Sequence, residues 1–445
     1  MRTARTIAIA AALVLAGAVG LSALDFDWGG NVDNLTTPSV ALGSGSQVWA
    51  IDQRDRAALW AEMRFSPQLS LTAQGSYAYE LQLPYLFDLD VLKLDWQVLP
   101  VLHASLGRFV FSDFTGHVLN HKLDGAMITL GFPAFVLTAS AGFSGLELKP
   151  YSLILMSRSD LADQSNSGVY FAAPRLVEKL DALFPNILSR QDLTLSVILQ
   201  QDLRASGSFI QPGDQQQLVP GNYGGSLYTE YVGAGLSGAI ISSFYYDAFL
   251  YANFGSTLSY MADSTSLTGF SWQYAPILAF LGGVGLHYYN EAFLSSRLEL
   301  LAVASSGDAD NTTFQEGNTA GSSTLFVPVS EEALGALGLA YQPQWGNLVA
   351  ISADYSFKPV SQLQLMTKVL SFLRPTTGAI FTGGLNPSSS DLYLGTEFDE
   401  TANFRPFSDL GLSLAIGFFL PNSSVFLGQA ALPALAGQLE VSFSF

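Results

Sequence analysis

The chain has 445 residues, of which 49% are hydrophobic, 12% are aromatic and only 13% are charged. A soluble globular domain carries about 25% charged residues, so this composition argues against an ordinary soluble protein. The 37 acidic and 19 basic residues give a net charge of −18, which argues against nucleic acid and anionic lipid as partners. The chain has no cysteine, which excludes disulfide bonds and lipid attachment through a cysteine.

The amino terminus predicts a secretory signal peptide. Arg2 and Arg5 precede an apolar, alanine-rich run that ends in Leu21-Ser22-Ala23. A short basic segment, an apolar segment and small residues are the three parts of such a signal. We expect cleavage near Ala23, with the cleaved bond left open because Leu21 is large for its position. A membrane anchor is the alternative, although the apolar run is short for one.

Beyond that segment, the sequence predicts a membrane protein built from strands. No other stretch approaches the roughly 18 consecutive apolar residues of a membrane-spanning helix. In lipid, a closed β-barrel is the other structure that pairs all of its backbone hydrogen-bonding groups. We therefore predict a signal peptide over residues 1–23 and one all-β domain, an antiparallel up-and-down transmembrane β-barrel, over residues 24–445. A secreted all-β protein is the alternative.

Many segments alternate between apolar and polar residues over about ten positions, which is the length that a tilted membrane-spanning strand requires. In Leu69–Glu80, for example, Leu71 and Tyr77 share one face while Thr72 and Gln74 share the other. The other clear segments are Arg56–Phe65, Leu193–Arg204, Phe293–Val303, Leu348–Phe357, Leu392–Thr401 and Leu410–Leu420. The count of such runs predicts about 18 strands, with 16 as the next choice because bacterial barrels have even numbers.

Prolines mark the predicted turns between strands. Pro67, Pro100 and Pro133 are spaced 33 residues apart, and each interrupts two strand-like runs. Proline cannot donate a hydrogen bond to a strand ladder, so it favours a turn. Gln342-Pro343-Gln344 and Arg405-Pro406-Phe407 predict two further tight turns. Barrels keep their turns short at the periplasmic rim, where we place all of these turns.

Long polar connections are expected at the opposite, extracellular rim. They are rich in Gly, Ser, Asn and Asp and comprise Ser157–Gln191, Ser206–Gly225, Ser256–Gln273, Ser305–Ser330 and Lys358–Ser390. Apolar residues at helical spacing predict a helix in Pro174–Leu188 and another in Leu363–Leu373. Such a connection could fold inward and constrict a pore, or cap the surface instead.

The carboxyl terminus predicts the last membrane-spanning strand. In Gly437–Phe445, Leu439, Val441 and Phe443 share an apolar face and alternate with polar residues. This pattern, which ends in Phe445, resembles the C-terminal assembly signal of bacterial outer-membrane β-barrels. The resemblance implies outer-membrane lipid and the outer-membrane assembly machinery as partners.

Charged residues on the polar faces of predicted strands are the candidate pore-lining residues. An Arg or Lys on the lipid face costs about 2–4 kcal/mol near the middle of the membrane, so these residues are expected to face the lumen. They are Arg56, Glu62, Arg64, Asp202, Arg204, Arg297, Glu299, Asp354, Glu397 and Asp399. Residues two apart on one strand are neighbours on the same face, which predicts three local ion pairs: Glu62/Arg64, Asp202/Arg204 and Arg297/Glu299. They either create a mixed-charge field that orients solutes or satisfy one another and keep the lumen wet.

Arg108 does not follow this rule. Simple alternation places it with apolar Leu106, whereas a β-bulge at Gly107 would turn it inward.

No pattern predicts a cofactor, a metal site or enzymatic activity. Asp308, Asp310 and Asn311 offer oxygen ligands for calcium, but their spacing is too short and too common to be specific, and a plain turn is the preferred interpretation. Asn120-His121 is not followed by a serine nucleophile, and no nucleophile elbow has a suitable context. The protein is therefore not expected to be an enzyme.

Five short motifs occur in an order that resembles the alginate-export-type family of outer-membrane barrels. They are Gly107-Arg108-Phe109 leading to Asp113, Asp124-Gly125, Ser306-Gly307-Asp308, Gly395-Thr396-Glu397-Phe398-Asp399 and Gly417-Phe418-Phe419-Leu420-Pro421. The resemblance implies an eighteen-stranded monomeric barrel through which solutes pass. An alginate exporter is expected to line its pore with arginine, so alginate itself does not suit this acidic chain.

The sequence thus predicts a porin-like channel in the outer membrane of a diderm bacterium, through which small polar solutes diffuse. A surface-exposed structural or adhesive barrel is the alternative, with ligand-binding extracellular loops. A polysaccharide export channel is a further alternative.

Overall fold

The computed structural model describes residues 25–43, 49–81, 85–187, 190–205, 226–266, 269–308, 324–330, 337–380 and 383–445. The predicted signal peptide and the predicted connection Ser206–Gly225 lie outside these residues, as do Asp310 and Asn311.

Within the described residues the chain forms eighteen strands and three short helices. The strands are β1 (Asp25–Ala41), β2 (Ala50–Ser66), β3 (Leu69–Glu80), β4 (Leu86–Leu99), β5 (Leu102–Ser112), β6 (Asn120–Phe132), β7 (Phe135–Phe143), β8 (Arg175–Phe184), β9 (Gln191–Asp202), β10 (Leu227–Ile241), β11 (Phe244–Ala262), β12 (Phe270–Asn290), β13 (Ser296–Ser305), β14 (Val349–Val360), β15 (Leu363–Leu373), β16 (Tyr393–Phe407), β17 (Leu410–Pro421) and β18 (Ala434–Ser444). The helices are η1 (Lys149–Tyr151), α2 (Arg158–Ser165) and η4 (Gly428–Ala431). None of these helices is long and apolar enough to cross a membrane.

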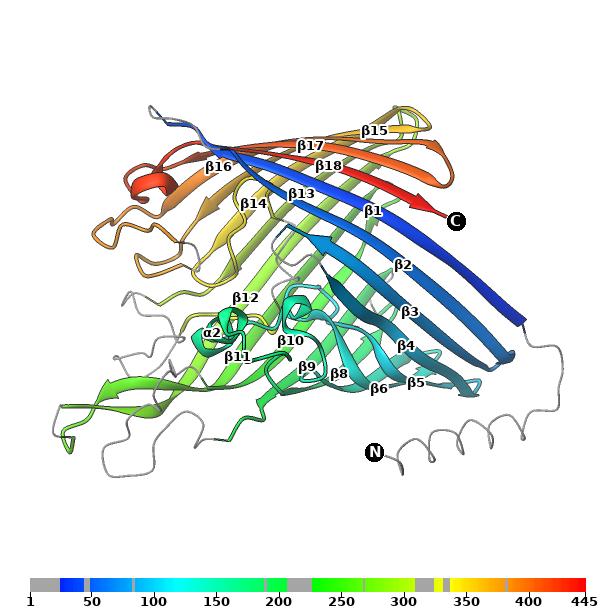
Figure 1. Ribbon diagram of the computed structural model, residues 1–445, viewed down its shortest axis with the longest axis horizontal. Helices are drawn as coiled ribbons and strands as arrows, with labels where there is room; N and C mark the ends of the chain where they lie inside the picture. Colours follow the sequence, from blue (N-terminus) through cyan, green and yellow to red (C-terminus); the bar gives the residue numbers. More distant parts are fainter. Residues whose placement is uncertain are drawn as a thin grey trace.

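The strands form one closed antiparallel barrel (Figure 1). Each strand pairs with its neighbours in the chain, and β1 pairs with both β2 and β18. Asn31 lies opposite Ser444 in the closing ladder. Beyond this ladder, the backbone N–H groups of Gly30 and Phe445 each donate to the other residue's carbonyl at 3.0 Å. The preferred prediction of eighteen strands is confirmed.

The barrel wall has an apolar outer face and a polar inner face. In β18, Leu439 and Phe443 point outward and are 45% and 47% exposed, while Glu440 and Ser442 between them point inward. Exposed leucine, valine, phenylalanine and tyrosine side chains occur on the outer faces of strands around the whole barrel. A soluble protein would not leave so much apolar surface in water, whereas the outer face of a transmembrane barrel contacts lipid.

The two rims of the barrel differ in the length of their connections. At one rim, Pro67, Pro100 and Pro133 lie in two-residue links between strands, so these three predicted turns are confirmed. Arg405–Phe407 ends β16 at the same rim, and the turn itself follows at residues 408–409. The other rim carries the longer connections, which include residues 144–174, 306–348, 374–392 and 422–433.

Two predicted helices are strands in the structure. Pro174–Leu188 contains β8, which pairs with β7 and β9, and Leu363–Leu373 is β15, which pairs with β14 and β16. Both segments are rich in leucine, so their apolar residues satisfy helical spacing as well as alternation. The neighbouring strand edges decide between the two, because an unpaired edge cannot remain open in lipid.

Three predicted connections are consequently shorter than expected. Ser157–Gln191 and Lys358–Ser390 each contain a complete strand, and Ser256–Gln273 reduces to residues 263–269. Gln342–Gln344 is not a tight turn at the short-turn rim, because it lies in the long connection between β13 and β14. A proline marks a break in a ladder but not the rim at which the break occurs.

A pair of arginine substitutions tests the two faces of β18. We expect Leu439→Arg to destabilise the folded barrel by about 2–4 kcal/mol, because it places a charge in lipid. Glu440→Arg should cost far less, since Glu440 lines a cavity of about 410 Å³ on the inner face. The heating temperature at which the barrel loses its fast gel mobility measures both variants. Equal losses of stability in the two variants would contradict the assignment of Leu439 to the outer face and Glu440 to the inner face.

Candidate functional site: the barrel lumen

Opposite charges meet along the inner face of β2 to β5. The Arg56 guanidinium lies 2.7 Å from the Asp90 carboxylate and 4.0 Å from that of Asp33. Lys93 contacts Asp95 at 3.0 Å, and the Asp95 carboxylate also lies 3.4 Å from the imidazole of His103. These contacts join charged side chains of β1, β2, β4 and β5, and make this part of the wall polar but locally neutralised.

A similar set of charges lines the inner face of β11 to β15. His287 lies 3.1 Å from Glu299 and also contacts Asp247, and Arg297 contacts the same Glu299 carboxylate. Further along the wall, Lys368 lies 3.9 Å from Asp354. The register places His287 opposite Glu299 and Glu299 opposite Asp354, so these charges form a continuous row across β12, β13 and β14.

All three predicted ion pairs are present. Arg64 contacts Glu62 at 2.7 Å, and Arg297 contacts Glu299. Arg64 is half exposed and also reaches Asp25 at 3.3 Å, which places this pair at the short-turn mouth of the barrel. These charges lie at one mouth of the barrel.

The third pair, Asp202 and Arg204, belongs to a buried cluster. Arg204 contacts Asp202 at 2.6 Å and Asp160 of α2 at 2.8 Å. Arg175, which is fully buried, also contacts Asp160 at 2.7 Å. Burial lowers the pKa of Arg204, but the two carboxylates outweigh this effect and raise its pKa overall. The pair therefore holds α2 against the ends of β8 and β9.

Glu397 holds a connection against the inner wall. Its buried carboxylate accepts hydrogen bonds from the backbone N–H groups of Leu339 and Ala340, both at 2.6 Å, and of Tyr341 at 2.8 Å. Tyr341 stacks on Phe419 of β17 with ring centroids 4.3 Å apart. Hydrogen bonds from neutral donors to a carboxylate are about twice as strong as those between neutral groups. Glu397 thus fixes part of the β13–β14 connection inside the ring of strands.

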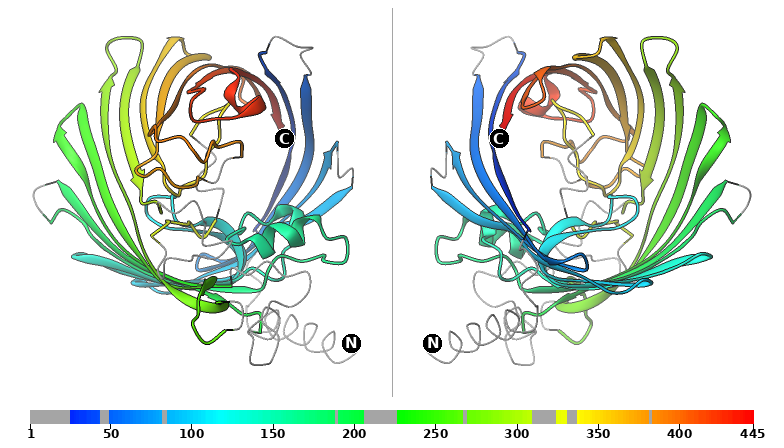
Figure 2. Two further views of the ribbon diagram at one scale, coloured as in Figure 1. Left: turned by 90° about the vertical axis from the view of Figure 1, so that its left-hand side faces the viewer. Right: turned by 90° about the vertical axis from the view of Figure 1, so that its right-hand side faces the viewer.

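The β5–β6 connection lies against the same inward segment. One carboxylate oxygen of Asp113 accepts from the backbone N–H groups of Val118 and Leu119. Val118 in turn accepts a 2.8 Å hydrogen bond from the backbone N–H of Val329 in the β13–β14 connection. Tyr231 of β10 donates its hydroxyl to the carbonyl of Val327 at 2.7 Å. Two connections therefore meet inside the barrel and narrow it, as Figure 2 shows in the end-on views.

A cavity lies beside these connections. It has a volume of about 360 Å³ and is lined by Phe114 and Thr115 of the β5–β6 connection together with Thr194, Ser237 and Asp247 of the wall. Small-molecule sites are typically about 300–1,000 Å³. The cavity combines the rings of Phe114, Phe249 and His117 with hydroxyl groups and a carboxylate, a lining that suits a small polar solute.

Sequence reasoning did not assign several residues that organise the lumen. Arg374 is buried at the end of β15 and donates to the carbonyls of Thr377, Gly378, Ser389 and Asp391. Burial lowers its pKa. Asn347 binds three carbonyls of residues 376–379 in a similar way. Both residues lie in polar connections and have no periodicity to distinguish them.

Asp308, which offered oxygen ligands in the sequence, is part of the described chain, and its carboxylate accepts a 3.3 Å hydrogen bond from the backbone N–H of Thr324. Among the described residues, no group of three or more His, Asp or Glu side chains could hold a metal ion.

No family model matches the chain, and no curated protein sequence matches it. Its structure is similar to that of OccK11 (OpdR) from Pseudomonas aeruginosa, at 12% identity and a TM-score of 0.59, covering 95% of this chain and 96% of that one. OccK2 (OpdF) of the same organism, solved in complex with glucuronate, has 13% identity and a TM-score of 0.55, with 95% and 98% covered. The P. aeruginosa outer membrane protein opdK has 11% identity and a TM-score of 0.55, and the match covers 94% of this chain and 98% of that one.

At these identities the likeness shows the fold, an eighteen-stranded barrel of the kind found in these Occ and Opd proteins. The comparisons do not support the resemblance to alginate-export barrels, whose short motifs instead mark residues of the barrel frame. Arg108 and Asp124, for example, are opposite one another in the β5–β6 ladder.

The hydrogen bonds of Glu397 generate a prediction about the inward connection. We expect Glu397→Gln to weaken the hold on residues 339–341 by about 1.5–3 kcal/mol, because the amide nitrogen cannot accept a hydrogen bond. Single-channel recording should then detect a larger or more variable conductance.

Glu400→Gln is the matched control on the same strand. Its exposed carboxylate accepts only from Thr367 among the described contacts, and it holds no connection. A conductance change of the same size in both variants would show that the hydrogen bonds from Glu397 to residues 339–341 are not responsible.

Proposed function

We propose that this protein is an outer-membrane channel through which small polar solutes cross by diffusion. The proposal is supported most directly by one observation: a closed barrel carries paired charges along its inner wall and has two connections folded inward. No covalent chemistry is required, and the absence of enzymatic activity remains a prediction.

The wall and the connections would have separate roles in passage. The apolar outer face contacts lipid and the closed wall keeps lipid out of the lumen, while the inward β5–β6 and β13–β14 connections limit the size of the solute. The rows of opposite charges create a transverse field that orients dipolar solutes as they pass. Acidic residues outnumber basic ones by 37 to 19 in the chain, so we expect cations to carry more of the ionic current than anions.

A sugar acid is the first solute to test. OccK2, which shares the fold, was solved in complex with glucuronate. Arg56, Arg297 and Lys368 of the inner wall provide cationic contacts for a carboxylate. Hydroxyl groups of a sugar would match the polar residues beside them.

We infer that the short-turn rim faces the periplasm and that the longer connections face the cell exterior, as is usual for outer-membrane barrels. The predicted signal peptide would direct export. The strand that ends at Phe445 would be the segment that the outer-membrane assembly machinery recognises.

Conductance measurements test the proposal directly. Purified protein refolded into planar bilayers should give stable ohmic steps with a preference for cations. Proteoliposomes should swell in glucuronate or in an uncharged sugar of similar size. A folded barrel that passes neither ions nor sugars would contradict a channel and favour a structural or adhesive role.

The lumen arginines generate a further prediction. Neutralising Arg56 and Arg64 together, as Arg56→Gln and Arg64→Gln, should raise the cation-to-anion permeability ratio about twofold to fivefold. This corresponds to about 0.4–1 kcal/mol, the scale of one charge acting over a few ångströms in a wet pore. Glu230→Gln is the control, because Glu230 lies on the outer face between exposed Tyr228 and Val232. An unchanged reversal potential in the arginine variant would exclude both residues from the conduction path.

A further inference from the structure

The barrel wall contains a break in its hydrogen-bond ladder. Among the described residues, the ladder between β4 and β5 ends where Leu92 lies opposite Arg108. Beyond this point, residues 86–91 of β4 pair only with β3, and residues 109–112 of β5 pair only with β6. We call the gap between these two stretches the seam. An open strand edge facing lipid is unfavourable, so something must cover it.

A change in backbone direction begins the seam. Gly107 has a φ of +120°, which favours glycine, and a Cβ at this position would lie 1.9 Å from the carbonyl oxygen of Leu92. This distortion resolves the sequence ambiguity of Arg108. Its side chain neither follows Leu106 into lipid nor enters the open lumen, but lies at the seam with 8% exposure.

Charged side chains replace the missing ladder. The Arg108 guanidinium donates to Asp124 at 2.6 and 2.9 Å, to the carbonyl of Leu89 at 3.2 Å and to that of Leu146 at 3.1 Å. It therefore joins β4, β6 and the β7–β8 connection across the gap. Asp88 of β4 is buried and lies 3.6 Å from the Arg108 guanidinium.

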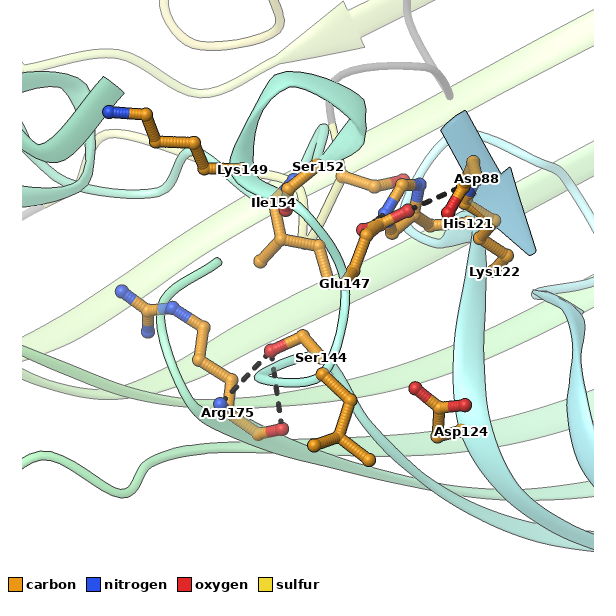
Figure 3. A network of polar contacts seen from close by, with 12 residues as sticks. Asp88, His121, Lys122, Asp124, Ser144, Glu147, Lys149, Ser152, Ile154 and Arg175 are labelled. Atoms are coloured by element: carbon orange, nitrogen blue, oxygen red, sulfur yellow. Dashed lines mark hydrogen bonds and ion pairs between the residues drawn. The ribbon is translucent and has the colours of Figure 1, made fainter. Parts of the chain in front are cut away.

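A second set of contacts joins β4, β6 and the β7–β8 connection (Figure 3). Lys122 of β6 contacts Asp88 and lies 3.4 Å from Glu147 of the β7–β8 connection. Glu147 is buried and lies 2.6 Å from the imidazole of His121. The seam is thus closed by ion pairs among β4, β5, β6 and the β7–β8 connection rather than by backbone hydrogen bonds.

An apolar groove lies over the seam on the outer face of the wall. It has a volume of about 720 Å³ and is open to the outside. Leu59 and Phe87 line it and are 61% and 69% exposed, and Leu89 and Leu148 complete its apolar surface. Its polar end is formed by Asp88 and Arg108. Apolar side chains and a pair of opposite charges therefore line the same cavity.

The groove lies at the depth of the lipid chains. Exposed Trp96 marks the membrane interface near the short-turn end of β4. A tilted strand rises about 2.5 Å per residue along the membrane normal, which places Leu89 about 18 Å from that interface, within an apolar band about 25 Å tall. Arg108, opposite Leu92, lies about 10 Å from the interface by the same estimate. Charged groups at such depth are costly and usually mark a functional site.

We propose that this groove binds a single-chain zwitterionic amphiphile from the membrane, of the lysophospholipid class. Its alkyl chain lies along Leu59, Phe87 and Leu89, where it removes apolar surface from contact with disordered lipid. Its head reaches Asp88 and Arg108, whose opposite charges match a cationic and an anionic group on one head. The site is on the outer wall and is independent of passage through the lumen.

Photolabelling tests the proposal on the full barrel in vesicles. The probe is an alkylphosphocholine that carries a diazirine on its alkyl chain, and the labelled peptides are identified by mass spectrometry. We expect labelling concentrated in β2 to β4 and around Leu148, which excess unlabelled alkylphosphocholine competes away. Labelling spread evenly over the outer face, or not reduced by the competitor, would overturn the proposal.

A matched pair of glycine variants controls for general lipid contact. Gly75 lines the groove, and a Cβ there would meet only ordinary contact with the carbonyl oxygen of Asp88 at 3.5 Å. Gly75→Phe should therefore fill the groove and abolish the competable labelling. Gly282→Phe, at another glycine of the wall, in β12, should leave it intact. A retained gel-mobility shift on heating establishes that each variant is folded, and retained competable labelling in folded Gly75→Phe would exclude the groove.

Discussion

The requirement that every backbone N–H and C=O be paired within the membrane shapes the whole structure. Lipid offers no hydrogen-bond partner, so a sheet in a membrane must close on itself. Here β1 meets β18, and the reciprocal hydrogen bonds of Gly30 and Phe445 extend the closure beyond the last ladder pair. The same requirement converts two leucine-rich segments that have helical spacing into β8 and β15. It also makes the seam between β4 and β5 unusual, because side-chain contacts there replace the backbone hydrogen bonds that the ladder lacks.

Charge has two distinct roles inside the barrel. Rows of pairs such as Arg56 with Asp90 and Lys368 with Asp354 line the wall. Buried charges such as Glu397 and the Arg175–Asp160 pair hold connections in place instead. The distinction depends on what each charged side chain of the wall meets: another side chain of the wall in the first case, and the backbone or a side chain of a connection in the second. A selective channel needs both kinds of charge. An electric field from the wall discriminates little between solutes unless inward connections also limit solute size.

The outer wall carries its own chemistry. The seam network of Arg108, Lys122, Asp88 and Glu147 lies where most barrels present only apolar side chains. Its ion pairs close the gap and place one carboxylate and one guanidinium, both largely buried, at the end of an apolar groove. Binding of an amphiphile there would stabilise the wall at its weakest ladder, because the ligand would cover the edge that β4 and β5 do not cover for each other.

Alternation along each strand depends only on local sequence, which is why the sequence determined the barrel, its number of strands, the three proline turns and the pairs Glu62/Arg64 and Arg297/Glu299. It did not place β8 and β15 among the strands. Neighbours on one strand face are two residues apart in any register. Other features depend on partners distant in the chain. The sequence did not reveal that Glu397 binds residues 339–341, that Asp202 and Arg204 hold α2, or that Gln342–Gln344 belongs to the long-connection rim. Only the tertiary structure decided these, because the closed ladder fixes which rim each connection joins and which loop backbone meets each buried charge.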